Sequence, residues 1–138
     1  MSAYNSEKST NQMLNLLNDV QGATTLAVAS TNVVYGKSFA LKKNKSYGIM
    51  LAFTGTTIDV KVELEEGNDE LTAAEEGSSK STWAVGTTIS TGITSSAARC
   101  LAVSPVVARY ARLKLTGQGA NSANVVLAQA TLGISENL

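Results

Sequence analysis

The sequence predicts an all-β protein, an antiparallel β-sandwich or jelly roll of about seven or eight strands behind a short N-terminal arm or helix. Apolar and polar residues alternate with a period of two over much of the chain after residue 22. Gly, Ser, Thr and Asn separate these runs at intervals of about ten residues. The 138 residues suffice for one domain, and charged residues make up only 16% of them, as in a Thr- and Val-rich β protein.

The first residues of the chain are predicted to stand apart, with residues 1–22 as an arm or short helix and residues 23–138 as a single β-sandwich domain. Thr10 is a potential helix cap and Gly22 a potential helix end. The apolar residues at helical spacing are Met13, Leu16, Leu17 and Val20. Two interpretations stay open: a packed helix or frayed terminus of this chain, and an arm that docks on a neighbouring subunit.

The remaining chain contains the predicted strands, which are residues 24–30, 32–41, 46–55, 57–67, 81–90, 98–105, 106–117 and 123–134. Gly36 interrupts the second run. The fourth run is the clearest, because every second residue is apolar and the residues between are charged, so that one face is core and the other is solvated. Gly55-Thr56 is predicted to form a hairpin turn between the third and fourth runs, and the last two runs are predicted to pair. Residues 68–80 are a polar excursion with at most one helical turn.

The run "ARYARLKLTG" (108–117) carries three basic residues inside a predicted strand. Alternation assigns one side to the core: Ala111, Leu113 and Leu115. The other side comprises Tyr110, Arg112 and Lys114. Arg112 and Lys114 are therefore expected to face solvent or a subunit contact. Arg109 comes before the strand proper and is expected at the rim of the sandwich, within reach of an acidic residue.

The charges of the chain balance, with 11 basic and 11 acidic residues. Most of the acids lie within residues 59–76, and bases predominate in residues 99–114. No net field attracts nucleic acid, and the two zones suit head-to-tail contact between subunits. No apolar run approaches the length of a membrane span. The N-terminus lacks the apolar segment of a secretory signal, so we expect synthesis in a cytoplasm and no membrane partner.

Residues that would carry chemistry are scarce. The chain has no histidine, which removes the commonest general base and metal ligand. Cys100, the lone cysteine, lies in an apolar alternation and is expected to be a small core residue. The acidic segment lacks the Asp-x-Asp-x-Asp-Gly spacing of a calcium loop, and no glycine motif fits a phosphate. We expect no enzyme, no catalytic residue, no cofactor and no metal, while cation binding by residues 59–76 stays open.

The last eighty or so residues also resemble a known group of proteins. "IDVKVELEEGNDE…STWAV" (58–85), followed by "SPVVARYARLKLTGQGANSANVVLAQATL" (104–132), is similar to small β-sandwich virion proteins of tailed bacteriophages. In these proteins a strand with a V-x-L pattern leads into a loop that ends at a Trp, and an ARY-x-R strand closes the sheet. "ARYARL" also resembles galactose-binding discoidin-like sandwiches, which normally bring more aromatic residues and a disulfide.

The resemblance and the composition together predict a capsid decoration or cement protein that oligomerises, plausibly as a trimer-like ring, and binds a major capsid protein or another virion protein. The predicted interface residues are Met13, Leu16, Leu17, Val20, Arg109, Tyr110, Arg112 and Lys114. One alternative is another head–tail or tail component. A second is a carbohydrate-binding module with Trp83, Tyr110 and Arg112 in a shallow site. A third is a small hydrolase that uses carboxylates of residues 63–76.

Overall fold

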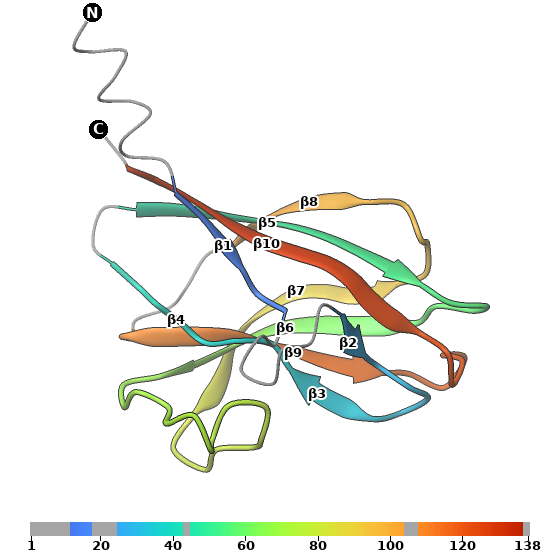
Figure 1. The fold of residues 1–138 in the computed structure, drawn as a ribbon, viewed down its shortest axis with the longest axis horizontal. Helices are drawn as coiled ribbons and strands as arrows, with labels where there is room; N and C mark the ends of the chain where they lie inside the picture. The colour runs from blue at the N-terminus through green and yellow to red at the C-terminus, as the bar shows by residue number, and fades with distance from the viewer. Residues whose placement is uncertain (1–11, 18–24, 43–44, 104–107, 137–138) are drawn as a thin grey trace, which may run out of the picture.

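The protein is a sandwich of two antiparallel sheets, packed face to face (Figure 1). The computed structural model describes residues 12–17, 25–42, 45–103 and 108–136. Each sheet has five strands, and the described residues contain no helix. The prediction of an all-β antiparallel sandwich is confirmed.

The strands follow the predicted runs closely. They are β1 (Gln12–Asn15), β2 (Leu26–Ala27), β3 (Val33–Tyr35), β4 (Phe39–Ala40), β5 (Lys45–Thr54), β6 (Val60–Gly67), β7 (Ala84–Ile93), β8 (Arg99–Val103), β9 (Tyr110–Gly117) and β10 (Val126–Glu136). The predicted interruption at Gly36 separates β3 from β4. A Cβ atom at Gly36 would lie 2.9 Å from the Leu16 carbonyl oxygen, so the crowding there requires glycine.

The strand order is that of a jelly roll. One sheet has the order β1-β10-β5-β8, with β2 also paired to β10, and the other has the order β3-β9-β6-β7, with β4 also paired to β9. The strands pair from the two ends of the chain inward. β1 and β2 pair with β10, β3 and β4 pair with β9, β5 pairs with β8, and β6 pairs with β7. The alternation in the sequence left open whether the protein is another antiparallel sandwich or a jelly roll. This nested pairing is that of a jelly roll.

Two predicted strand pairs are wrong. β5 and β6 belong to different sheets, so Gly55-Thr56 is not a hairpin turn but the start of a crossing between sheets. Gly55 has a φ of +151°, and Thr57 exchanges hydrogen bonds with Ser122 instead of with a hairpin partner. β9 and β10 likewise lie in different sheets. Alternation fixes which face of a strand is apolar, but it carries no information about the partner strand.

The predicted helix near the N-terminus is also wrong over the described residues. Residues 12–15 form β1, which pairs antiparallel with β10, and the Leu16 N–H donates to the Ala130 carbonyl at 2.9 Å. Leu16 and Leu17 are buried in the core of the same chain. The edge of β10 offers unpaired backbone groups, and pairing with them outweighs the helical spacing. The sandwich thus begins before the predicted boundary at residue 23. Val20 lies outside the described residues.

The core lies between the sheets and is built from the inward residues of the long strands. The fully buried members include Ile49, Leu51, Phe53, Val60, Val62, Leu64, Leu113, Leu115, Leu127 and Leu132. Burial of each such side chain is worth roughly 1.5–3 kcal/mol. At one end of the sandwich the buried Asn121 joins three segments, since its amide donates to the carbonyls of Val28 and Ser30 and its oxygen accepts from the Asp59 N–H.

Candidate functional site: the two outer faces of the sandwich

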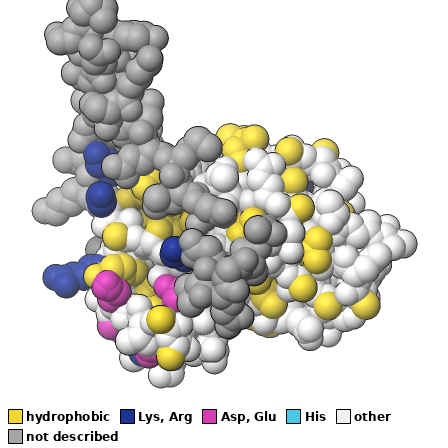
Figure 2. Space-filling view, viewed as in Figure 1, with side chains coloured by type: hydrophobic (Ala, Val, Ile, Leu, Met, Phe, Trp, Pro, Cys, Tyr) yellow, Lys and Arg dark blue, Asp and Glu magenta, His cyan; other side chains and the backbone are white. Residues whose placement is uncertain are grey.

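The two sheets present very different outer faces. We call the outward side of β9 and β6 the charged face; its members are Lys61, Glu63, Glu65, Arg112 and Lys114. We call the outward side of β8, β5 and β10 the uncharged face; its members are Ser46, Gly48, Met50, Ala52, Cys100, Ala102, Gln129, Thr131, Gly133 and Ser135. In Figure 2 the charged side chains gather toward the end of the molecule that carries the loop after β6.

Arg112 is the centre of the charged face, and it is completely buried. Its Nε donates to Glu65 Oε1 at 2.7 Å, from the directly opposite position on β6. Its Nη2 donates to the Ser78 carbonyl at 2.7 Å. The guanidinium carbon lies 3.9 Å from the Tyr35 ring centroid and 5.4 Å from that of Trp83. The aromatic rings, the carboxylate and the carbonyl replace part of the water that the cation loses, while Nη1 has no hydrogen-bond partner among the described residues.

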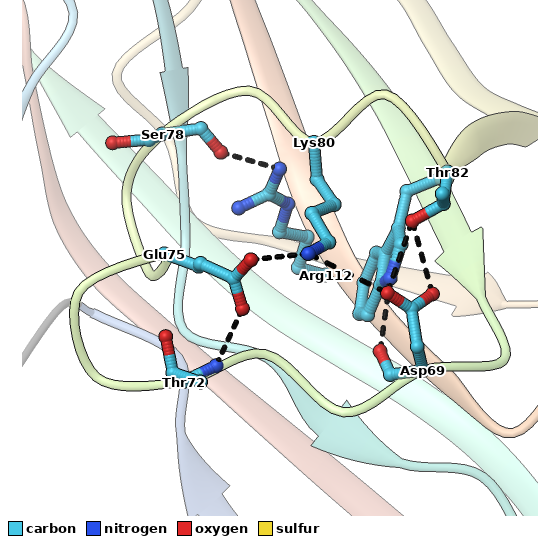
Figure 3. A network of polar contacts seen from close by, with 8 residues as sticks. Asp69, Thr72, Glu75, Ser78, Lys80, Thr82 and Arg112 are labelled. Atoms are coloured by element: carbon cyan, nitrogen blue, oxygen red, sulfur yellow. Dashed lines mark hydrogen bonds and ion pairs between the residues drawn. The ribbon is translucent and has the colours of Figure 1, made fainter.

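The loop between β6 and β7 covers Arg112. Figure 3 shows Lys80 between Glu75 and Asp69, two of the carboxylates of this loop. Lys80 forms ion pairs with Glu75 and, at 3.6 Å, with Asp69. Glu75 also accepts the Thr72 N–H at 2.9 Å. The Thr72 carbonyl in turn accepts the N–H groups of Glu75 and Glu76, which gives the single helical turn expected in residues 68–80.

These contacts shift the pKa of the three charged groups. Hydrogen bonds from Lys80 and from the Thr72 N–H lower the pKa of Glu75 to about 2. Desolvation acts to raise the pKa of Asp69, but hydrogen bonds from Thr82 and from its own backbone, together with Lys80, outweigh it and lower that pKa. The hydrogen bond to Glu75 raises the pKa of Lys80. The cluster is therefore ionised at neutral pH and joins both ends of the loop.

Trp83 closes the loop onto the sheet. Its Nε1–H donates to the Asp69 carbonyl at 3.0 Å, and the side chain is buried. The ring lies against Gly67, where a Cβ atom would overlap it. Gly67 is thus required by close approach of the ring. The shallow carbohydrate site predicted from Trp83, Tyr110 and Arg112 is not open in this structure, because Trp83 and Arg112 are both buried.

The predicted residues of β9 divide into two groups. Ala111, Leu113 and Leu115 are fully buried in the core, as predicted. The expectation that Arg112 faces solvent is wrong, because the loop covers it. Lys114 lies opposite Glu63. The acidic and basic zones therefore meet within one chain at β6 and β9, while head-to-tail contact between subunits through these zones stays a prediction.

The other predicted interface residues have less decisive positions. Arg109 is exposed just before β9, and its N–H donates to Asn68 Oδ1 at 3.0 Å. Tyr110 is half-buried at the start of β9. Met13 is placed by register opposite Gly133. A contact of these residues with another subunit stays a prediction.

The uncharged face was not identified from the sequence. Met50 is 39% exposed at its centre, and its register partners are Cys100 on β8 and Thr131 on β10. Cys100 is exposed, so the prediction that it is a core residue is wrong. Both faces of residues 100–103 are apolar or small, which hid the outward side. The signal that could have revealed this face was the set of uncharged, mostly small residues at the outward positions of residues 46–55.

Outside the two faces, the side chains of the described residues that could carry out chemistry lie apart from one another. No three Cys, Asp or Glu side chains gather there as metal ligands would. An open depression of 360 Å³ beside the crossing from β5 to β6 contains hydroxyl groups and no charged group; it is lined by Gly55, Thr56, Thr57, Ile58, Thr94, Ser95 and Ser96. Within the same described ranges, no helix is long and apolar enough to cross a membrane.

Comparison with known proteins adds little to this picture. No protein-family model matches the chain, and no curated protein matches it. Among solved structures, a chain in the crystal structure of the T13 IBDV viral particle is similar over 93% of this chain and 31% of its own length, with a TM-score of 0.49 and 10% sequence identity. The protein thus spans less than a third of that viral chain. Similarity this low supports no functional assignment, which has to come from the residues of the chain itself.

Proposed function

We propose that this chain is a non-enzymatic structural protein of a virus particle and, more specifically, a subunit that decorates or cements a capsid of a tailed bacteriophage. The observation that carries the proposal is the division of the outer surface. The central charged groups of one face are bound within the chain, whereas the other face offers small uncharged side chains. A sheet face of this kind suits contact with other proteins, in which charged residues are depleted from the centre.

Two further points support the proposal. The carboxylates that a hydrolase would need are engaged in the fold: Glu65 is paired with Arg112, and Glu75 with Lys80. The jelly-roll architecture recurs in viral capsid domains, although it also hosts lectins and cupins. The fold is therefore an analogy that favours the class without naming the function. The resemblance of residues 58–85 and 104–132 to phage virion proteins favours the decoration role within that class.

The proposal names the partners as well. The subunit forms a homo-oligomer, in which a trimer-like ring is one arrangement, and it binds the major capsid protein or another virion protein after synthesis in the host cytoplasm. Symmetric self-association lets one small chain present the same contact many times on a lattice. Neither nucleic acid nor a membrane belongs to this proposal, since the net charge is zero.

The test is quantitative mass spectrometry of purified particles from the phage that encodes the chain. We expect a fixed copy ratio to the major capsid protein, and we expect purified protein to rebind particles from which it has been stripped. A few copies per particle would assign the chain to the head–tail junction or tail instead. Complete absence from particles would refute the virion role.

A further inference from the structure

We propose that the depression beside the crossing from β5 to β6 is a binding site for a neutral sugar. We call it the hydroxyl depression; it is lined by Gly55, Thr56, Thr57, Ile58, Thr94, Ser95 and Ser96. Two stretches that cross between the sheets form its walls, one from β5 to β6 and the other from β7 to β8. Both lie at the end of the sandwich opposite the loop between β6 and β7 (Figure 1), and so apart from the carbohydrate site predicted around Trp83.

The lining of the hydroxyl depression indicates the class of ligand. All seven lining residues are uncharged, and five of them carry a hydroxyl. A hydroxyl both donates and accepts hydrogen bonds, so it matches the hydroxyls of a sugar. Pockets for apolar ligands are lined mainly by apolar side chains, which are few here. Asp59 and Arg99, which follow the two crossings along the chain, do not line the depression, so no counter-ion awaits a charged ligand.

Three of the hydroxyls are available to a ligand. They belong to Thr57, Thr94 and Ser96, which are exposed and whose side chains form no hydrogen bond within the described residues. Thr57 lies on one wall and the other two residues on the second wall, so a ligand between the walls can bond to both. The buried Ile58 adds apolar surface, against which the C–H groups of a sugar ring can pack.

The first wall is held in place by the connection between β9 and β10. The Thr56 N–H donates to Asn124 Oδ1 at 3.0 Å, and Asn124 Nδ2 donates back to Thr56 Oγ1 at 2.8 Å. The Thr57 N–H donates to Ser122 Oγ at 2.9 Å, and the Ser122 N–H donates to the Thr57 carbonyl at 2.9 Å. A wall that is fixed before binding loses little freedom when a ligand arrives.

The size of the depression suits one sugar residue of a longer chain. Its volume of 360 Å³ lies near the lower end of pockets for small molecules, which measure about 300–1,000 Å³. Because the depression is open to solvent, a single sugar should bind with a dissociation constant of about a millimolar. Many copies on one particle would strengthen attachment to a polysaccharide through avidity. Only this gain rests on the proposed function, since the site itself belongs to the single chain.

The first experiment tests binding directly. The ¹⁵N-labelled full chain is titrated with glucose, galactose, mannose and N-acetylglucosamine, and its amide signals are followed by NMR. We expect at least one of these sugars to shift the signals of residues 55–58 and 94–96 in a saturable way. Residues 68–80, at the opposite end, are the internal control, and their signals should stay in place. If none of the four sugars shifts the signals of the depression, the inference is overturned.

The second experiment removes two of the available hydroxyls with little change in size, in the double variant Thr94→Val/Ser96→Ala. Both residues are exposed, so the temperature of unfolding should change little. The dissociation constant for the sugar should rise about tenfold or more, because two hydrogen bonds are lost. The matched control is Thr31→Val, an exposed residue between β2 and β3 that does not line the depression, and its constant should stay unchanged.

The remaining outcomes separate this inference from the proposed function. A double variant that binds sugar as tightly as the wild-type chain would overturn the inference. A wild-type chain that binds no sugar, together with a double variant that no longer rebinds stripped particles, would also overturn it and would assign the depression to contact with a virion protein. Absence of the chain from particles, with sugar binding intact, would instead refute the proposed function and leave the sugar site standing.

Discussion

The two outer faces of the sandwich differ in how their side chains are used. On the charged face, the chain folds its own loop over Arg112, which has no exposed surface. On the uncharged face, Met50 stays 39% exposed although it is apolar. A cation that is easily hydrated is thus buried, and an apolar side chain that water solvates poorly is exposed.

This difference teaches that the charged residues of a sequence need not mark its contact surface. Arginine is a residue type expected in binding sites, yet the Arg112 guanidinium already contacts Glu65, Tyr35 and the Ser78 carbonyl of its own chain. The charged face and its loop behave as a second small core. The uncharged face, whose sequence is least conspicuous, is the one that we propose for contact with other proteins. The predictions below test this division.

The largest effect is expected for Arg112→Ala. The substitution leaves Glu65 buried without its partner and removes the cation between two rings, which should cost about 3–5 kcal/mol of the free energy of unfolding. Urea denaturation measures the loss. Lys114→Ala, on the same strand and side but partly exposed, is the control and should cost about 1 kcal/mol or less. Equal losses for the two variants would contradict the view that the charged face is a core.

A second effect is expected for Gly67→Ala, since the added methyl group meets the Trp83 ring. The ring must move, and overpacking of this kind costs about 1–3 kcal/mol. Trp83 is the single tryptophan of the chain, so its fluorescence reports the change directly and should shift to the red as the ring becomes hydrated. Gly119→Ala is the control, because nothing lies within 4 Å of a Cβ atom there. An unshifted spectrum for Gly67→Ala would show that the loop is not held by this contact.

The sequence predicted the strands well because alternation is a local property. Residues 57–67 show it plainly, and β6 lies within them. The pairing was missed because a jelly roll pairs positions that are distant in the chain, such as β1 with β10. The burial of Arg112 was missed for the same reason: whether an outward position is wet depends on a loop that the alternation does not describe.

Where both sides of a strand are weakly polar, the sequence also could not predict which side faces the core. Cys100 and Leu101 alternate, but both are apolar enough for a core, and only the register with β5 shows that Leu101 faces inward. The spacing of Leu16 and Leu17 in the sequence fits a helix, whereas their contacts in the structure are those of residues at the end of a strand. Tertiary pairing decides such cases, because a short isolated helix has little stability of its own.

A smaller effect is expected at acidic pH, in the loop between β6 and β7. The pKa of Glu75 is about 2 in the folded chain against an ordinary value of 4.5, so its contribution is complete above pH 4.5 and is lost as the pH falls toward 2. Trp83 fluorescence should follow loosening of the loop in this range. Lys80→Met removes the main cause of the shift, and its fluorescence should change less between these pH values. An identical acid response would show that the ion pairs do not hold the loop.

The smallest effect is expected on the uncharged face, where Ala102→Lys adds a charge. Ala102 is exposed on the edge strand β8, so the ammonium group stays in water and the free energy of unfolding should change by about 0.5 kcal/mol or less, measured by urea denaturation of dilute protein. Glu65→Lys places the same side chain on the buried outer position facing Arg112, where two cations would meet without solvent, and it should abolish stable folding or cost several times more. If both substitutions were equally mild, the loop would not exclude water from the charged face. If both were severe, the uncharged face would be part of the core of the single chain.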